Sequence, residues 1–423
     1  MRSFFRKENM LIRIKQLLPT VILLFTIPMF GQVFDPAKGC VIDNNGECIS
    51  NTLLTAVPFL RITPDARSGA MGDAGVALSP NANSLHFNAS NLVFSEEQSG
   101  FAFTYTPWLR NLNLDDIFLL YVSGFYKLDE NQAIGGGIRF FSLGDIDFTS
   151  AQGASLGTGR PREGEFTLAY ARKLGDKLSA SLSGKYVFSN LASGLNVNGV
   201  DINTAASFAA DFGLNYRTKT KLGGYKGEWS YGLAITNIGS KLSYTRDNSV
   251  KDFIPANLGL GSSLKLEFDD YNSLTFALDF NKLLVPTPIA KKIAGSDGVP
   301  IDNPNWDKTG EKGIADYREK ALFAGMLGSF SDAQGGLREE MREVSISFGA
   351  EYWYDKQFAF RGGYYWESAE KGNRRFFTVG AGIKYNVFGI DLSYLVPTSN
   401  LPNPLDNTLR FSLLFDFSVF TAD

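Results

Sequence analysis

Apolar and polar side chains alternate every second residue over most of this chain, and no other feature constrains its fold as strongly. In the segment 178–188, Leu178, Leu182 and Phe188 stand on one row, while serines and a lysine occupy the other. Successive side chains of a strand point to opposite faces, so each segment has one apolar and one polar face. The segments are about ten residues long, the length of a tilted strand that crosses a bilayer. The alternation therefore predicts an all-β fold whose strands span a membrane.

The number and spacing of these segments predict how the strands close. We count fourteen, near residues 98–106, 117–127, 132–142, 165–174, 178–188, 204–217, 228–238, 257–267, 273–283, 344–354, 357–367, 376–385, 388–396 and 408–417. Short polar connections alternate with long ones along the chain, as periplasmic turns and extracellular loops do in bacterial barrels. We therefore predict a 14-stranded antiparallel transmembrane β-barrel of a Gram-negative outer membrane, with both termini periplasmic.

Two other fold classes fit the sequence less well. A helical membrane protein needs runs of about 20 apolar residues, and none follows the N-terminal region. A soluble sandwich would also alternate, but its strands are shorter and its connections are short on both sides. The 41 basic and 44 acidic residues nearly balance, so no basic field favours nucleic acid as a partner.

The N-terminal region reads as a secretion signal followed by a cysteine pair. Basic residues precede an apolar stretch from Leu17 to Phe30, which predicts a signal peptide over residues 1–31; a retained membrane anchor is the alternative. In an oxidising compartment Cys40 and Cys48 are expected to form a disulfide. A lipid attachment site or a metal site would be the alternative use of these cysteines, but no lipobox-like residues precede Cys40 and no histidine stands nearby.

Two regions do not belong to the predicted barrel, which occupies residues 98–423. Residues 32–97 form a predicted N-terminal periplasmic or plug segment, because the stretch 52–97 has too many Pro, Gly, Asn and Ser residues for a membrane strand. The extracellular insert 284–343 is too long for an ordinary hairpin loop. Within the insert we expect a helix from Ala315 to Leu327, with Tyr317, Ala321 and Leu322 as its buried stripe.

The sequence contains few of the residue combinations that form catalytic or metal sites. His86 is the only histidine, so a polyhistidine metal cage cannot form, and we expect His86 to be structural or solvated. Glycines at 135–137 and at 259 and 261 fall inside strand patterns and do not read as phosphate-binding loops. Asp145 and Asp147 could bind calcium, although such pairs are common on solvated loops. We predict that the protein is not an enzyme and uses no cofactor or metal.

Three stretches carry a family resemblance. They are the run Val57–Arg67, the run Met71–Ala77 and the Ser-Phe-Ser-Asp-Ala-Gln-Gly-Gly run from Ser329 to Gly336, which acidic residues follow. These stretches resemble the PorV family of the Bacteroidetes type IX secretion system, relatives of the FadL fatty-acid transporters. The resemblance implies a 14-stranded barrel, and one departure is Asn88-Ala89-Ser90 where such proteins usually read Asn-Pro-Ala. The final segment 408–417 also resembles the C-terminal aromatic signal that barrel-assembly machinery recognises, although six residues follow it.

The resemblance and the insert together suggest candidate sites. The plug motif consists of Arg61, Pro64, Asp65, Arg67, Gly72 and Asp73. We expect the insert to carry partner or cargo recognition because strand parity places it outside the cell. Its candidate residues are Phe330, Asp332, Gly335, Gly336 and Leu337. A glycine pair here either fixes a turn at the recognition site or only shapes the loop.

The resemblance implies a component of the secretion system. Its partners would be the translocon barrel SprA/Sov, the sortase PorU, the C-terminal signal domains of secreted cargo, and outer-membrane lipid. The alternatives are a FadL-like channel for long-chain fatty acids or other hydrophobic small molecules, and a structural or adhesive barrel. A polar lumen favours secretion over a fatty-acid tunnel, and the residues expected to face inward are Asp211, Asn215, Arg217, Lys265, Glu267, Asp279, Glu351, Arg361, Lys384, Asp391 and Arg410.

Overall fold

A computed structural model describes most of the chain in two units, Met1–Cys48 and Ile49–Asp423. The described residues are 33–35, 40–42, 52–108, 116–149, 153, 155–194, 196–197, 200–245, 250–288, 292–294, 300–302, 318–333, 336–398 and 408–417. In the first unit, β1 (Val33–Asp35) pairs antiparallel with β2 (Cys40–Ile42). The predicted signal peptide and Cys48 lie outside the described residues, so cleavage and the disulfide stay predictions.

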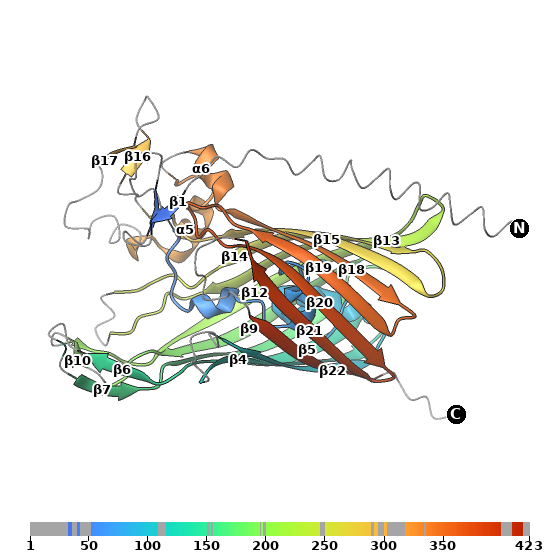
Figure 1. Ribbon diagram of the computed structural model, residues 1–423, viewed down its shortest axis with the longest axis horizontal. Helices are drawn as coiled ribbons and strands as arrows, with labels where there is room; N and C mark the ends of the chain where they lie inside the picture. Colours follow the sequence, from blue (N-terminus) through green and yellow to red (C-terminus); the bar gives the residue numbers. More distant parts are fainter. Residues whose placement is uncertain are drawn as a thin grey trace, which may run out of the picture. The chain divides into compact units, whose positions relative to one another are not determined.

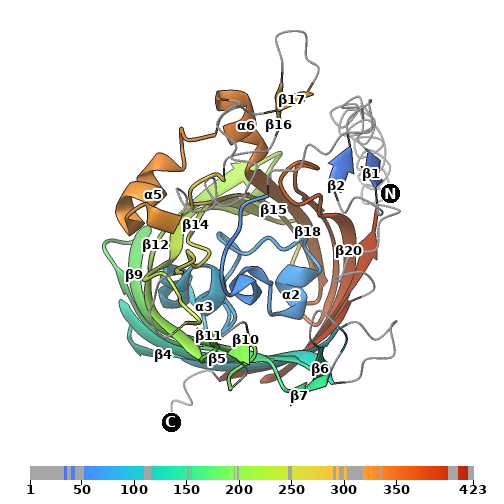
Figure 2. The same ribbon diagram turned by 90° about the vertical axis from the view of Figure 1, so that its left-hand side faces the viewer.

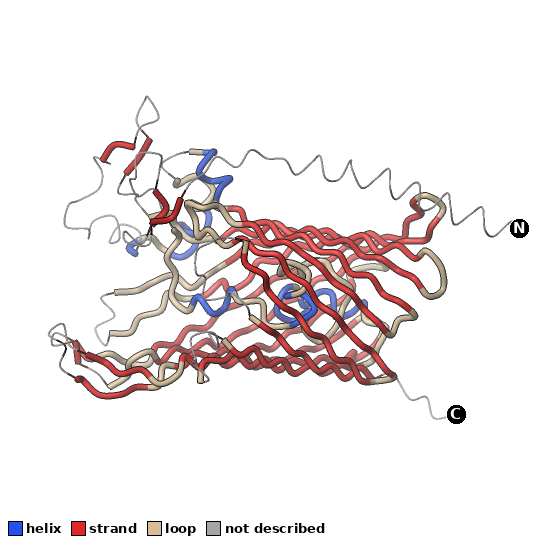
Figure 3. Tube along the Cα trace, viewed as in Figure 1, coloured by secondary structure: helices blue, strands red, loops and turns tan. Residues whose placement is uncertain are grey.

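The second unit is built around a closed antiparallel barrel, which we call the wall (Figures 1 and 3). In chain order its strands are β3 (Ser99–Pro107), β4 (Ile117–Asp129), β5 (Gln132–Leu143), β8 (Arg162–Lys173), β9 (Leu178–Asn190), β12 (Ala205–Leu222), β13 (Tyr225–Gly239), β14 (Asn257–Glu267), β15 (Asn272–Leu283), β18 (Val344–Tyr354), β19 (Phe358–Trp366), β20 (Arg375–Tyr385), β21 (Phe388–Pro397) and β22 (Leu409–Phe417). Each strand pairs with its neighbours along the chain, and β22 pairs with β3 to close the ring. The predicted 14-stranded barrel is confirmed.

The β12–β13 hairpin is longer than the alternation predicted. Its strands continue past Arg217 to a turn at Gly223 and Gly224, both of which have positive φ. The extra residues are mostly polar, and backbone pairing needs no apolar row to continue. The apolar alternation therefore predicts the part of each strand that faces lipid, but it underestimates the full length of the hydrogen-bonded strands.

The two faces of the wall differ as a membrane barrel requires. On the outer face large apolar side chains are open, with Leu168 75% and Phe208 74% exposed. On the inner face the alternate row is buried and polar, as Ser183 and Lys185 illustrate. A water-soluble protein seldom exposes so large an apolar surface, whereas a lipid-facing wall requires it. Among the described residues, no helix is long and apolar enough to cross a membrane.

Long and short connections lie at opposite ends of the wall, which we call the loop end and the turn end (Figure 1). The long connections carry three small hairpins: β6 (Ile146–Thr149) with β7 (Ser155–Gly159), β10 (Asn196–Val197) with β11 (Val200–Asp201), and β16 (Lys292–Ala294) with β17 (Pro300–Asp302). In the orientation expected from strand parity, the loop end is extracellular.

Residues 52–97 form what we call the plug: Leu53 contacts Phe253 at the loop end, and the helical segments that follow lie inside the ring (Figure 2). The plug contains η1 (Pro58–Arg61), α2 (Ala66–Gly69), α3 (Ser84–Phe87) and η2 (Ala89–Phe94). Leu85 and Leu92 pack with small wall residues, including Ala133 and Ala171, in one apolar cluster. These elements are too short to be stable alone, so the packing against the wall maintains them.

The insert, residues 284–343, holds two short helices, α5 (Leu322–Gly328) and α6 (Leu337–Arg342). The prediction of one continuous helix over 315–327 is wrong. Ala321 is extended (φ −62°, ψ 151°) and separates α5 from the residues before it. Arg318 is bonded to Asp252, whereas Met326 of α5 packs with Ile235, Ile238 and Leu258 of the wall. Of the predicted stripe, Leu322 is partly buried in apolar packing, Ala321 is exposed, and Tyr317 lies outside the described residues. The fully buried residues of α5 are Gly325 and Met326.

Candidate functional site

The centre of the plug is tied to the wall by a buried chain of charges. Asp65 caps α2 by accepting the backbone N–H of Ser68. Two residues after Asp65, the Arg67 guanidinium donates from Nε to Glu351 Oε2 (2.8 Å) and from Nη2 to Glu351 Oε1 (2.7 Å). Glu351 also accepts from Arg361, which in turn donates to Asp391 at 2.6 Å. A two-point guanidinium–carboxylate pair fixes orientation as well as distance, so α2 is held in one register against β18.

The next plug residues touch the wall through their backbone. Gly72 has φ +65°, and its N–H donates to Thr378 Oγ1 at 2.9 Å. A Cβ at this position would lie 2.6 Å from the carbonyl oxygens of Phe348 and Tyr364. Only glycine combines this left-handed backbone with so close an approach. Asp73 follows, also with positive φ, and its carboxylate lies 3.9 Å from the guanidinium of Arg410.

Further along the plug, a carboxylate of the wall and an amide side chain of the plug form hydrogen bonds with backbone groups. The Asp279 carboxylate on β15 accepts the backbone N–H groups of Gly75 (2.7 Å) and Val76 (2.9 Å). The Asn88 side chain accepts the N–H of Ser90 and donates to the carbonyl oxygens of Val76 and Leu214. At the position where the resemblance predicts Asn-Pro-Ala, this chain therefore still caps the turn with Asn88.

Arg139 of β5 forms a second buried centre that the sequence reasoning did not identify. It donates to Glu165 at 2.9 Å and to the carbonyl oxygens of Phe59, Leu60 and Ile62. Its Nη2 also lies 3.0 Å from His86 Nδ1. A guanidinium can only donate, so Nδ1 accepts and the imidazole is neutral. His86 is thus a structural residue of the plug, and Arg139 could have been found from its place opposite the apolar row of β5.

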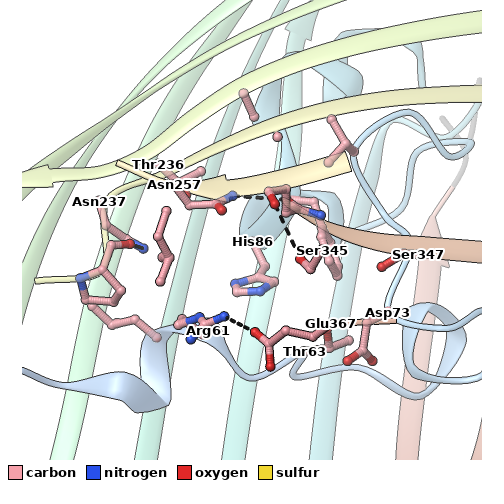
Figure 4. A pocket seen from close by; sticks show the side chains of 18 of the residues that line it. Arg61, Thr63, Asp73, His86, Thr236, Asn237, Asn257, Ser345, Ser347 and Glu367 are labelled. Atoms are coloured by element: carbon pink, nitrogen blue, oxygen red, sulfur yellow. Dashed lines mark hydrogen bonds and ion pairs between the residues drawn. The ribbon is translucent and has the colours of Figure 1, made fainter. Parts of the chain in front are cut away.

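A cavity of about 110 Å³ remains between the plug and the wall (Figure 4). Its lining is mainly polar and charged, and it includes Arg61, Asp73, His86, Asn257 and Glu367. Figure 4 shows these side chains converging from the plug and from several strands. A space of this size suits a few water molecules and is smaller than a pocket for a drug-sized ligand.

Arg61 and Glu367 join the plug to the loop end across this cavity. Arg61 Nη2 donates to Glu367 Oε1 at 3.0 Å, and Arg374 donates to both Glu367 oxygens at 2.8 and 2.9 Å. Burial alone would raise the pKa of Glu367. The charges and hydrogen bonds of Arg374 and Arg61 outweigh burial and lower this pKa to about 2. The carboxylate is therefore ionised at any physiological pH.

The insert is anchored to the loop end by its own ion pairs. Lys282 at the end of β15 donates to Glu340 (2.9 Å) and Glu343 (2.7 Å), and Lys371 donates to Glu343 at 3.0 Å. Asp332 accepts from the Thr287 backbone at 3.2 Å and from the Lys320 ammonium at 2.8 Å. These contacts hold the insert as a folded element rather than a loose loop.

The predicted recognition residues of the insert have different surroundings. Asp332 is half-buried and engaged within the insert, as described above. Gly336 precedes α6 with φ 64° and ψ −153°, a conformation nearly confined to glycine. Gly335 lies outside the described residues. Phe330 and Leu337 are open, with 48% and 77% of their surface exposed. Only these two have apolar surface available to a partner.

Most residues expected to face the lumen take part in these networks. The plug is contacted by Asp279, Glu351, Arg217, Lys384 and Arg410. Asp211 and Asn215 bond to other wall residues. Lys265 and Glu267 pair with each other at 3.2 Å and remain about half exposed. In the described part of the chain no three potential metal ligands gather, and Arg160 pairs with Asp145 at 2.7 Å.

Comparisons with known proteins give one family. The model of the family described as Type IX secretion system protein PorV matches residues 45–290, more than half of the chain. A search of curated proteins found no match.

Three solved structures with similar folds share little sequence with this chain. The toluene transporter TbuX of Ralstonia pickettii is 15% identical with a TM-score of 0.47, covering 84% of this chain and 98% of its own. The toluene transporter TodX of P. putida is 13% identical with a TM-score of 0.47, and the match covers 84% of this chain and 99% of TodX. A FadL homologue of Pseudomonas aeruginosa is 9% identical with a TM-score of 0.38, and the match covers 87% of this chain and 100% of the homologue. Similarity at this level does not indicate what this chain binds.

Proposed function

The chain belongs to the PorV family of type IX secretion system proteins, and we propose that it is a non-enzymatic component of that system. In this proposal it binds secreted cargo through the cargo's C-terminal signal domain at the translocon barrel SprA/Sov. It then passes the cargo to the surface attachment complex that contains the sortase PorU. The protein acts as an integral outer-membrane barrel, so its working surfaces are the loop end, the lipid-facing wall and the lumen.

The observation that carries the proposal is the plug. The Arg67–Glu351 pair and the backbone contacts of Gly72 fill the middle of the lumen with bonded polar groups. The cavity left over is small and mainly polar in its lining. A long-chain fatty acid would need a longer, apolar path, so the FadL-like channel is the weaker candidate and recognition is better assigned to the loop end.

The insert supports the same assignment. It is held by the buried Lys282 and Lys371 ion pairs, yet it presents open apolar side chains. Phe330, Leu337 and Met341 are 48%, 77% and 63% exposed. Buried apolar anchors with a polar rim are typical of protein interfaces. We therefore propose that Phe330 and Leu337 contribute to the cargo or partner interface.

Replacing residues 290–340 by a short Gly/Ser linker tests this function. The wall hydrogen bonds are untouched and Glu343 still pairs with Lys282, so the barrel should still migrate faster in SDS before boiling than after. Secretion of type IX cargo should fall sharply. Replacing the β6–β7 hairpin, residues 146–159, by a similar linker is the matched control and should leave secretion unchanged.

Two outcomes would contradict parts of the proposal. If the 290–340 variant assembles and secretes cargo at the normal rate, the insert is not the recognition element. Purification of the intact protein in mild detergent gives the second readout. Co-isolated translocon or cargo supports secretion, whereas bound fatty acid without either supports the channel.

A further inference from the structure

Helix α5 packs on the rim of the wall: Leu322 contacts Phe253 and Leu283 at the loop end, and part of the helix covers the outer face of the wall. Its Leu322 and Met326 belong to an apolar cluster with Ile235 and Ile238 of β13 and Leu258 of β14. Viewed from the loop end, α5 lies at the margin of the ring beside β12 and β14 (Figure 2). The insert therefore contacts the outer face of the wall through α5.

Strand pairing shows that the contacted wall residues face outward. Ile235 pairs with Phe212 of β12 and with Leu258 of β14, and directly paired residues share a face of the sheet. Phe212 is an exposed outer-face residue. The neighbouring pair, Ala234 with Gly213, has the opposite orientation, since a Cβ on Gly213 would meet plug residue Asn88. The surface under α5 is thus continuous with the lipid-facing row of the barrel.

The opposite side of α5 is apolar and uncovered. The helix Leu322–Gly328 contains no polar or charged side chain. Phe323 is 67% exposed and Leu327 is 75% exposed. Gly325 fixes the helix in place, because a Cβ there would lie 2.9 Å from Phe253 and Pro286. The helix therefore cannot rotate to bury Phe323 and Leu327 without losing this close contact.

We propose that α5 is an interfacial helix and that membrane lipid covers Phe323 and Leu327. An apolar helix that rests on the lipid-facing wall at its rim lies at the boundary between headgroups and acyl chains, where apolar side chains are stabilised by burial. The basic residues just before it, Arg318 and Lys320, pair with Asp252 and Asp332. The lipid contact anchors the insert at a fixed height above the bilayer. This inference goes beyond the proposed function, since it holds whether or not the insert binds cargo.

Quenching by brominated lipid tests the proposal. Phe323→Trp and Leu327→Trp are each reconstituted in phosphatidylcholine vesicles whose acyl chains carry bromine, and the fluorescence lost is compared with the unsubstituted protein. Leu260→Trp on the outer face of β14 is the lipid-contacting control. Ile146→Trp on β6, which extends beyond the wall in Figure 1, is the water-exposed control. We expect the two α5 variants to lose at least about half as much added fluorescence as Leu260→Trp.

Quenching by aqueous iodide distinguishes the other occupants. If both α5 tryptophans resist bromolipid and are quenched by iodide as strongly as Ile146→Trp, α5 lies in water and the proposal is wrong. If both quenchers fail, a protein surface covers α5, either a second copy of this chain or a partner, and the proposal is again overturned. Loss of secretion after insert replacement affects neither readout, so this inference and the proposed function can fail separately.

Discussion

Arg67 and Glu351, which are 284 residues apart in sequence, form two parallel charge-assisted hydrogen bonds inside the barrel. Arg67 belongs to a helix of four residues, and Glu351 belongs to a strand of the wall. Both side chains are nearly inaccessible to solvent. The pair connects a helix too short to be stable alone to the closed sheet of the wall.

Arg67→Ala should release the plug from the wall. Removing one partner leaves Glu351 buried and paired only with Arg361, which should destabilise the plug by about 3–5 kcal/mol. The plug should become cleavable by protease in the folded barrel, while heat-modifiable migration persists. Arg160→Ala is the control, since the Arg160–Asp145 pair has the same chemistry on an exposed loop and should show no measurable effect. Equal protease resistance of the two variants would show that the pair does not hold the plug.

The Glu367 carboxylate should make the contact between plug and loop end sensitive to acid. Its folded pKa is about 2, below the ordinary 4.5. A depressed pKa contributes stability that is complete above about pH 4.5 and is lost as pH falls toward 2. The loss should be on the order of 3 kcal/mol.

Hydrogen exchange of the segment 58–62 measures this effect. In the unsubstituted protein its protection should fall between pH 4.5 and 2, after correction for intrinsic exchange rates. In Glu367→Gln, which cannot ionise, protection should be lower at pH 7 and change little over that window. Parallel pH profiles for the two proteins would assign the acid response to other groups.

Gly72→Ala should prevent the plug from seating while the wall still closes. The added Cβ would meet two wall carbonyl oxygens at 2.6 Å in a left-handed backbone. Gly184→Ala is the matched control, because nothing lies within 4 Å of a Cβ there. Limited proteolysis should cut the plug in the first variant only. An intact plug in Gly72→Ala would mean that the wall yields at this contact.

Cys40 and Cys48 should carry no free thiol before reduction. A double Cys40→Ser, Cys48→Ser variant should still give a heat-modifiable barrel, because a short disulfide loop before the first wall strand stabilises only its own segment. Thiol labelling of the denatured protein with and without reductant measures the pairing. Two labelled cysteines in the unreduced protein would refute it.

The positions of the wall strands could be predicted because the alternation that marks each strand is contained in the strand's own sequence. Each lipid-crossing strand, such as Leu178–Asn190, carries its own alternation of faces. The hairpin turns are marked by residues such as Asn386, which adopts positive φ. The sequence also shows that the inward row is charged, as Glu351 and Arg361 illustrate. Fourteen strands, the long insert and the polar lumen followed from these local patterns alone.

The pairing of the inward charges could be decided only by the tertiary structure. Nothing near Arg67 in the chain identifies Glu351 as its partner, and Arg139 gave no sign that it would bond to three plug carbonyl groups. The contact of α5 with the outer wall likewise depends on Ile235 and Leu258, far away in sequence. Sequence periodicity determines which face a side chain takes, because that depends on the backbone around it. Which distant group it meets depends on strand register and on how the ring closes, and these belong to the whole fold.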